Sequence, residues 1–204
     1  MKLYHLNSGP LRVNTYFLVG DEGKAVVIDS GENYNAVVRT AERYGLHIDA
    51  VLLTHAHFDH AGNVKKLQDG GAKIYVGEKD AEKLLNDDNL ASSFGRRFEK
   101  CRADVTLKEG DVVEEAGLKI KVLETPGHTD GSLTYMLNNM LFTGDTLFLE
   151  SVGRTDFPSG SRSQLINSIR KLFALDGDFD VYPGHEEFTT LTHERKYNTF
   201  ADYD

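Results

Sequence analysis

The chain has 204 residues, of which 40% are hydrophobic and 27% are charged, and this composition is ordinary for a globular protein that buries its own core. Its 32 acidic residues outnumber its 23 basic ones, so the formal net charge is −9. This charge argues against a general nucleic-acid or anionic-membrane partner, since both need a basic face. No apolar run is long enough to span a bilayer, and the first nine residues lack a secretory signal.

The cysteine and histidine counts narrow the kinds of site that are available. The single cysteine, Cys101, excludes an internal disulfide and is typical of a reducing compartment, so we expect a cytoplasmic protein. Because there are eight histidines and only one cysteine, any metal site must consist of imidazole and carboxylate groups.

The first half of the chain alternates between strand and helix patterns. Residues 21–23 have the composition of a hairpin turn between the first two strands, and Gly45 is typical of a helix end. Runs rich in β-branched, aromatic and other apolar residues predict strands at 14–19, 24–28, 50–53 and 73–76. Apolar residues spaced along one face predict helices at 34–44 and 61–67.

The second half repeats this alternation, which favours an α/β layered fold over separate all-α and all-β domains. Residues 86–104 lack clear periodicity and predict a loop or irregular helix over one face. A helix at 165–173 is preceded by Ser161, which has capping-box spacing to Gln164. Strands are predicted at 118–123, 132–137, 140–142 and 179–182.

The sharpest motif is His55-Ala56-His57-Phe58-Asp59-His60, which places four metal-binding side chains within six residues. It follows an apolar strand directly, at the place where an α/β sheet presents its binding groups. His55 and His57 can converge from a turn on one ion, while Asp59 and His60 face a neighbouring one. Asp59 also falls at the N-terminus of the next helix, where the helix dipole favours an anion.

Three more residues with metal-binding side chains, His128, Asp145 and His185, each follow a predicted strand and a glycine. A glycine lets the backbone turn sharply and aim the side chain that follows it. Alone, each would more often be an ordinary loop residue. Together with the first motif they supply five imidazoles and two carboxylates, enough for two metal ions with one shared carboxylate and open positions for water.

These motifs, with Val27-Ile28-Asp29-Ser30-Gly31 before the first helix, resemble the metallo-β-lactamase-fold superfamily over nearly the whole chain. The resemblance implies a four-layer αββα sandwich in which residues 1–204 form one catalytic domain. It also implies that Asp29 supports the ligand loop. By the same resemblance the first metal would be held by His55, His57, His128 and Asp145, and the second by Asp59, His60, His185 and the bridging Asp145.

One segment, Gly153-Arg154-Thr155-Asp156-Phe157-Pro158, most resembles the glyoxalase II-like and persulfide dioxygenase groups of this superfamily. Val152 stands where both groups commonly have cysteine. Asp145 stands where the commonest class of β-lactamases has cysteine, which argues against antibiotic hydrolysis. Because the chain ends soon after His185, we expect it to lack the C-terminal helical domain with which glyoxalase II binds glutathione. It is most similar to shorter, single-domain glyoxalase II-like proteins.

The resemblance therefore implies a metal-dependent hydrolase that uses a metal-bridging hydroxide on thioesters such as hydroxyacyl-glutathione. Metal binding lowers the pKa of water towards about 7, so this nucleophile exists at neutral pH. Asp59 would orient it as well as bind metal. The cofactors would be two divalent ions, zinc first, with iron or manganese as alternatives. The expected partner is a small-molecule thioester, with no nucleic acid and no membrane, and no oligomeric state is predicted.

Three alternatives stay open, because the ligand types alone do not decide between them. The first is a persulfide dioxygenase with one iron, held by His55, His57, His128 and Asp145. The second is a lactonase that uses the same two-metal site. The third is a metal-binding module without turnover, which a complete set of ligands disfavours.

The expected substrate contacts come from loops. Arg154 either pairs with Asp156 within its own segment or contacts an anionic substrate, and the internal pair is favoured because such loop pairs are common. Within residues 86–104, a candidate lid, Phe94 offers an apolar wall, and Arg96 and Arg97 offer cationic contacts to carboxylates. His5, His47 and His193 have no place in the ligand scheme and are expected to be surface or packing residues.

Overall fold

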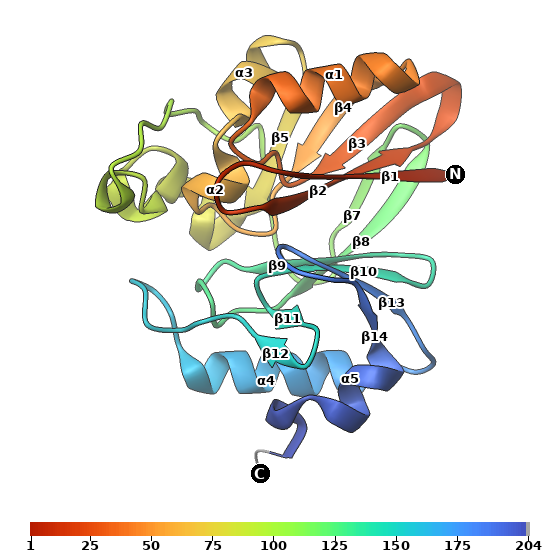
Figure 1. Cartoon of the computed structure of the whole chain (residues 1–204), viewed down its shortest axis with the longest axis vertical. Coiled ribbons are helices and arrows are strands. Elements are labelled where there is room, and N and C mark those ends of the chain that lie inside the picture. Colours follow the sequence, from red (N-terminus) through yellow and green to blue (C-terminus); the bar gives the residue numbers. More distant parts are fainter. Residues whose placement is uncertain (203–204) are drawn as a thin grey trace.

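A computed structural model describes residues 1–202, which form two six-stranded sheets packed face to face with helices on both outer sides (Figure 1). The strand order is β1-β2-β3-β4-β5-β6 in the first sheet and β14-β13-β10-β9-β8-β7 in the second. This arrangement confirms the predicted four-layer sandwich of helices, sheet, sheet and helices. The last two residues of the predicted domain, 203–204, lie outside the described residues.

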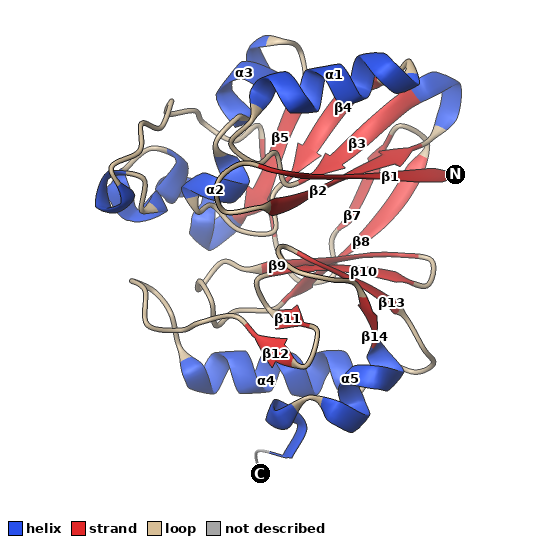
Figure 2. Cartoon of the chain, in the orientation of Figure 1, coloured by secondary structure: helices blue, strands red, loops and turns tan. Residues whose placement is uncertain are grey.

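The first sheet is antiparallel from β1 to β3 and parallel from β3 to β6. Helices α1 and α3 cover its outer side (Figure 2). Its strands are β1 (Lys2–Ser8), β2 (Val13–Val19), β3 (Lys24–Ile28), β4 (His47–Leu52), β5 (Lys73–Gly77) and β6 (Val105–Leu107). The helices of this half are α1 (Tyr34–Tyr44), α2 (Phe58–Ala61) and α3 (Val64–Asp69), with short 3₁₀ turns η1 (Asp21–Gly23), η2 (Glu78–Leu84), η3 (Asp87–Asn89) and η4 (Ser92–Phe94).

The second sheet is antiparallel except for the parallel pair β10 and β13. Its strands are β7 (Val112–Glu115), β8 (Leu118–Glu124), β9 (Leu133–Leu137), β10 (Met140–Gly144), β13 (Asp180–Pro183) and β14 (Thr189–Thr190), and a small separate hairpin consists of β11 (Leu147–Phe148) and β12 (Ser151–Val152). Its outer side carries α4 (Arg162–Phe173), α5 (Leu191–Tyr197) and η5 (Thr199–Asp202). None of the helices in residues 1–202 has the length and apolar character of a membrane span.

The local sequence signals explain where the helices begin and end. Helix α1 ends at Gly45, whose φ of 64° is the left-handed conformation that glycine adopts without strain. The Ser161 side chain accepts a hydrogen bond from the Gln164 N–H, so the predicted cap of α4 is confirmed. The helix predicted at 61–67 is confirmed from residue 64 as α3, but its predicted start is wrong, because residues 62–63 separate α2 from α3. A Cβ at Gly62 would lie 2.8 Å from the Phe58 carbonyl oxygen, which leaves no room for a larger residue.

The main core lies between the two sheets, where large apolar side chains from both inner faces pack together, among them Leu18, Ile28, Leu52, Ile120, Leu133 and Phe142. Two further apolar clusters lie outside the sandwich core. One joins the first sheet to its outer helices, and the other joins the second sheet to its outer helices. A polar contact also crosses the sandwich: the Tyr135 hydroxyl on β9 donates to the Leu53 carbonyl after β4, at 2.7 Å. The two halves are thus held face to face by apolar burial and at least one buried hydrogen bond.

The strand directions bring six loops to one edge of the sandwich. β3, β4 and β5 are mutually parallel, and so are β10 and β13. β8 runs parallel to β10, because each is antiparallel to β9. The loops that follow these six strands contain Asp29, His55, Asp80, His128, Asp145 and His185. Residues widely separated in the chain therefore meet at one place.

We expect Ile120→Ala to lower the free energy of unfolding by about 2–5 kcal/mol, because Ile120 is 0% exposed between the sheets and its truncation leaves a cavity. Val112→Ala is the matched control, since Val112 on the neighbouring strand is 53% exposed, and its effect should stay within about 0.5 kcal/mol. Urea unfolding of the two variants measures the difference. Equal effects would contradict the assignment of the core to the inner faces.

Candidate metal centre

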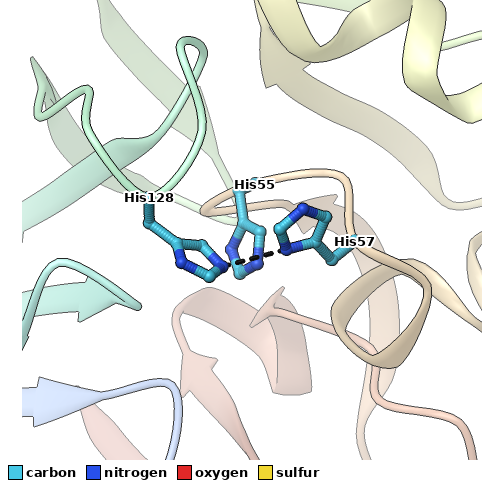
Figure 3. A group of neighbouring side chains, drawn as sticks. All are labelled: His55, His57 and His128. Carbon is cyan, nitrogen blue, oxygen red and sulfur yellow. Dashed lines mark hydrogen bonds between the residues drawn. The ribbon is translucent and has the colours of Figure 1, made fainter. Parts of the chain in front are cut away.

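Three histidines from two loops form the first group of side chains at this edge. His55 and His57 follow β4, His128 follows β8, and all three are buried. Figure 3 shows their rings pointing toward one another. Nε2 of His128 lies 2.9 Å from Nδ1 of His57. The Nε2 atoms of His55 and His57 are buried and have no hydrogen-bond partner among the described residues.

A second group lies beside the first and consists of Asp59, His60 and His185. Nε2 of His60 is 3.2 Å from Nε2 of His185, which in turn is 3.4 Å from Oδ2 of Asp59. Asp145 lies between the two groups: its Oδ1 is 3.3 Å from Nε2 of His60, and its Oδ2 is 3.5 Å from Nε2 of His128. The structure therefore brings together all seven side chains that the sequence singled out.

The outward nitrogens of three rings are held by oxygen acceptors. In His60, His128 and His185 the Nδ1 atom faces an oxygen, which directs Nε2 of each ring to the centre. These acceptors are the Asp29 carboxylate at 2.7 Å, the Arg154 carbonyl at 2.8 Å and the Leu11 carbonyl at 3.0 Å. The Gly153–Pro158 segment thus contributes a backbone oxygen that orients His128.

Histidines of the two groups differ in the direction of their pKa shifts. Burial and the neighbouring imidazoles lower the pKa of His55 well below its usual value and that of His57 to about 3, so both rings are neutral at pH 7. In His60 burial is outweighed by nearby carboxylates, first that of Asp29, and the pKa is raised. Burial likewise opposes ionisation of Asp145, but the adjacent imidazoles, led by His60, hold its pKa well below the usual range. Neutral imidazole and ionised carboxylate are the forms that bind metal.

The donor set fits two divalent cations. Three buried polar atoms at the centre lack any hydrogen-bond partner among the described residues: Nε2 of His55, Nε2 of His57 and Oδ1 of Asp145. Buried polar atoms are rarely left unpaired, so the unsatisfied His55 nitrogen and Asp145 oxygen, whose side chains belong to one close group, indicate a site for an ion. Imidazole and carboxylate are donors that zinc, iron and manganese accept.

Asp29 holds the histidine cluster from behind. Its φ of 53° is left-handed, a conformation that aspartate tolerates better than most residues. The carboxylate accepts hydrogen bonds from the Thr54 N–H and hydroxyl, each at 2.8 Å, as well as from Nδ1 of His60 at 2.7 Å. The predicted contact of Asp29 with the ligand loop is therefore present.

The loop of His185 is fixed by packing and by two polar residues of β2. A Cβ at Gly184 would lie 2.4 Å from Oδ1 of Asp145, so only glycine fits at this position. The Tyr16 hydroxyl donates to the Pro183 carbonyl at 2.6 Å, and the Asn14 side chain donates to the same carbonyl at 3.1 Å. The roles of Asn14 and Tyr16 were not predicted. The sequence shows only that these two polar residues belong to a predicted strand. The structure adds that this strand is buried along its whole length, so their polar atoms need partners.

The sequence profile of the metallo-β-lactamase superfamily matches residues 8–185. The chain belongs to this superfamily. The resemblance inferred from the histidine motifs is thereby confirmed, and with it the general expectation of divalent metal binding.

Two curated relatives of similar length are named as hydrolases. A probable metallo-hydrolase of Streptococcus pyogenes serotype M6 is 34% identical, over 98% of this chain and 90% of the relative. The hydroxyacylglutathione hydrolase GloC of Haemophilus influenzae is also 34% identical, over 93% of this chain and 92% of the relative. The chain is a metallo-hydrolase of the metallo-β-lactamase superfamily.

Solved structures show the same fold with different chemistries in their names. The B3 metallo-β-lactamase BLEG-1 superposes with a TM-score of 0.94 at 33% identity, covering 99% of this chain and 100% of the other. TTHA1623, solved in a di-iron-bound form, has a TM-score of 0.87 at 34% identity over 97% and 99%. ETHE1 from Myxococcus xanthus has a TM-score of 0.83 at 30% identity over 98% and 84%. This superfamily member is therefore similar both to a protein named as a β-lactamase and to a protein that binds two irons.

An open cavity of about 1160 Å³ lies over the centre of this superfamily member. Its floor contains side chains of both groups: His57, Asp59, His128, Asp145 and His185. One wall is apolar and consists of Phe58, Leu90, Phe94 and Phe157. The lining also includes His5, Arg12 and Phe188, so His5 faces the cavity as well as packing against Phe188.

The predicted substrate-contact residues differ in their positions. Phe94 lines the cavity and is 48% exposed. Arg154 also lines it, but its guanidinium donates two hydrogen bonds of 2.6 Å to Asp156, the internal pair that the sequence favoured. Arg96 forms an ion pair with Glu32 at 3.7 Å, and neither Arg96 nor Arg97 is among the described residues that line the cavity. Contact of these two arginines with substrate stays a prediction.

We expect Asp29→Ala to lower the free energy of unfolding by about 3–5 kcal/mol, because it leaves the buried His60 ring and the Thr54 N–H without their acceptor. Asp49→Ala is the matched control. It removes a histidine–aspartate contact of similar length, 2.6 Å, to the exposed His47, and should change stability by less than about 1 kcal/mol. Chemical denaturation of both variants in the presence of a chelator measures the difference, and similar losses would contradict the role of Asp29.

Proposed function

We propose that this metallo-hydrolase cleaves thioesters of the hydroxyacyl-glutathione type with two divalent ions, zinc foremost. The observation that carries this proposal is the position of Asp145 between two groups of ligand-type side chains. The similarity to the hydroxyacylglutathione hydrolase GloC supports the choice of substrate class. One ion would be held by His55, His57, His128 and Asp145, and the other by Asp59, His60, His185 and the shared Asp145.

Bound divalent ions would supply a nucleophile at neutral pH and polarise the thioester carbonyl. The chain's own residues would place the substrate and the attacking water. Asp59 lines the cavity floor, and its carboxylate can accept a hydrogen bond from that water while it faces His185. The wall that contains Phe94 and Phe157 would hold apolar parts of the substrate and exclude water from the reacting carbon.

A persulfide dioxygenase with one iron is the second candidate. One observation favours it, the resemblance of the Gly153–Pro158 segment to that group. The similarity to TTHA1623, solved in a di-iron-bound form, supports iron as a metal for this fold but not a single ion. The group of His55, His57 and His128, completed by Asp145, would hold the single ion. The two candidates differ in metal content and in oxygen use, and both differences are measurable.

The deciding experiment measures metals per chain in the purified protein and assays it with four substrates. These are a hydroxyacyl-glutathione thioester, glutathione persulfide with an oxygen electrode, an acyl-lactone, and a chromogenic β-lactam, the last because of the similarity to BLEG-1. We expect two ions and thioester hydrolysis that a chelator abolishes and added zinc restores. Oxygen uptake with one iron per chain would overturn the proposal, as would preferred hydrolysis of the lactone or the β-lactam.

The same assay tests the ligand assignment. We expect His57→Ala and Asp145→Ala each to lower kcat/KM by at least about a hundredfold, because each removes a ligand of the catalytic ion. His47→Ala is the control, since His47 is an exposed histidine outside the cavity, and it should retain full activity. Wild-type rates in either ligand variant would contradict the assignment.

We expect Phe94→Ala to raise KM for the thioester about 3- to 10-fold with little change in kcat, because it removes apolar area that contacts substrate rather than the reacting atoms. Tyr197→Ala, which truncates another exposed ring outside the cavity, should leave KM unchanged. Steady-state kinetics of the two variants give the comparison. A fall in kcat alone would place Phe94 outside substrate binding.

A further inference from the structure

A buried carboxylate outside the seven ligand-type residues touches both loops of the three-histidine group. Asp80 lies in η2, just after β5, and is 0% exposed. Its Oδ2 atom accepts a hydrogen bond from the Ala56 N–H at 2.8 Å and another from the Thr129 hydroxyl at 3.0 Å. Ala56 stands between His55 and His57, and Thr129 follows His128. One oxygen atom therefore joins the backbone of the first loop to the side chain of the second.

The other oxygen of Asp80 is paired with a lysine. The Lys83 ammonium, itself buried, binds Oδ1 of Asp80 and also the carboxylate of Asp130, in the same loop as His128. Burial disfavours the charged lysine, but the two carboxylates outweigh it and raise the pKa of Lys83 above its usual value. The charge of Asp80 is thus balanced where water cannot solvate it, which a buried carboxylate requires.

The second loop lies directly against Asp80. A Cβ at Gly131 would be 2.4 Å from Oδ1 of Asp80, so the backbone approaches as closely as glycine allows. Within the loop, the Thr129 N–H donates to the Ser132 hydroxyl at 3.0 Å, and the two hydroxyls lie 2.8 Å apart. The loop that contains His128 therefore has little freedom to shift relative to Asp80.

Asp29 and Asp80 act on different parts of the centre. Asp29 contacts the His60 ring and Thr54, which belong to the second group and to the start of the first loop. The hydrogen bonds of Asp80 go to the middle of the first loop and to the loop of His128. Among the described residues Asp80 forms no hydrogen bond to an imidazole, so any effect on the histidines passes through the loops that carry them.

We propose that Asp80, balanced by Lys83, is a positioning residue that sets the affinity of the three-histidine group for its metal ion. It does so by fixing the distance between the loop of His55 and His57 and the loop of His128. The proposal rests on the assignment of a metal ion to this group under the proposed function, but not on the identity of the substrate.

Asp80→Asn is the sharpest substitution because it preserves shape and removes one acceptor. An asparagine side chain has one carbonyl oxygen and one NH₂ group. If the oxygen faces Ala56 and Thr129, the NH₂ group faces the Lys83 ammonium. If the amide turns over, the NH₂ group faces the Ala56 N–H. Either orientation places two donors against each other. Even where the amide oxygen still accepts from Ala56 and Thr129, it lacks the charge that strengthens these hydrogen bonds, so the side chain holds the two loops less firmly.

The experiment measures zinc affinity of the metal-free protein by competition with a chromophoric chelator. We expect D80N to weaken one of two zinc-binding events by about 10- to 100-fold and to leave the other within about twofold of wild type. T129V should weaken the same zinc-binding event. T129S keeps the hydroxyl and should bind zinc with wild-type affinity. D104N is the matched control, since Asp104 accepts the Ile74 N–H at 2.8 Å at the start of β5, away from the centre. It should bind zinc as the wild type does.

A folded D80N protein with wild-type affinity for both zinc ions would overturn the proposal. If thermal unfolding shows that D80N does not fold, the comparison of T129V with T129S decides, and equal affinities of these two would overturn it. If H57A leaves both binding events unchanged, the metal assignment itself is wrong, and the inference fails with it. Absence of thioester hydrolysis in a protein that binds two zinc ions contradicts only the proposed reaction, because the chelator competition needs no substrate.

Discussion

Burial of many ionisable groups in one small volume is the constraint on which the rest of this structure depends. Five imidazoles and two carboxylates meet there, mostly out of contact with bulk water. Such a cluster is stable only if each group has a partner, and the protein meets this need in two ways. Backbone carbonyls and Asp29 bind the outward nitrogens of three of the rings, those of His60, His128 and His185. The atoms that face inward are left for cations. The fold and the metal centre therefore stabilise each other.

The two-sheet architecture explains how distant residues can meet with the required precision. Three parallel strands of one sheet and three of the other end at the same edge, so each contributes one loop to the centre. The apolar core between the sheets fixes the relative position of the two halves. Polar residues behind the loops, such as Asn14 and Asp80, then adjust the loops locally. Large-scale position comes from apolar packing, and fine position comes from buried hydrogen bonds.

Much of the fold and nearly all of the centre could be predicted from sequence, because strands with strong apolar character end in recognisable motifs. The strand before His55 and the capped helix after Ser161 are examples. Edge strands such as β1 and β6 escaped prediction, since they have few buried positions and a weak pattern. Asp80 escaped because its role depends on partners far away in the chain, Ala56 and Thr129. The spacing of residues within one segment of the sequence gives no information about contacts with distant segments.

Arg154 combines two functions that its backbone and side chain keep apart. Its carbonyl oxygen orients His128, while its guanidinium pairs with Asp156 in a segment that lines the cavity. A carbonyl is common to all amino acids, so a different residue at this position would still hold the histidine as long as the loop keeps its path. The surface presented to a substrate would nevertheless change. During evolution, members of such a family can therefore exchange the side chain at this position and acquire new specificities, while the inherited metal centre is preserved.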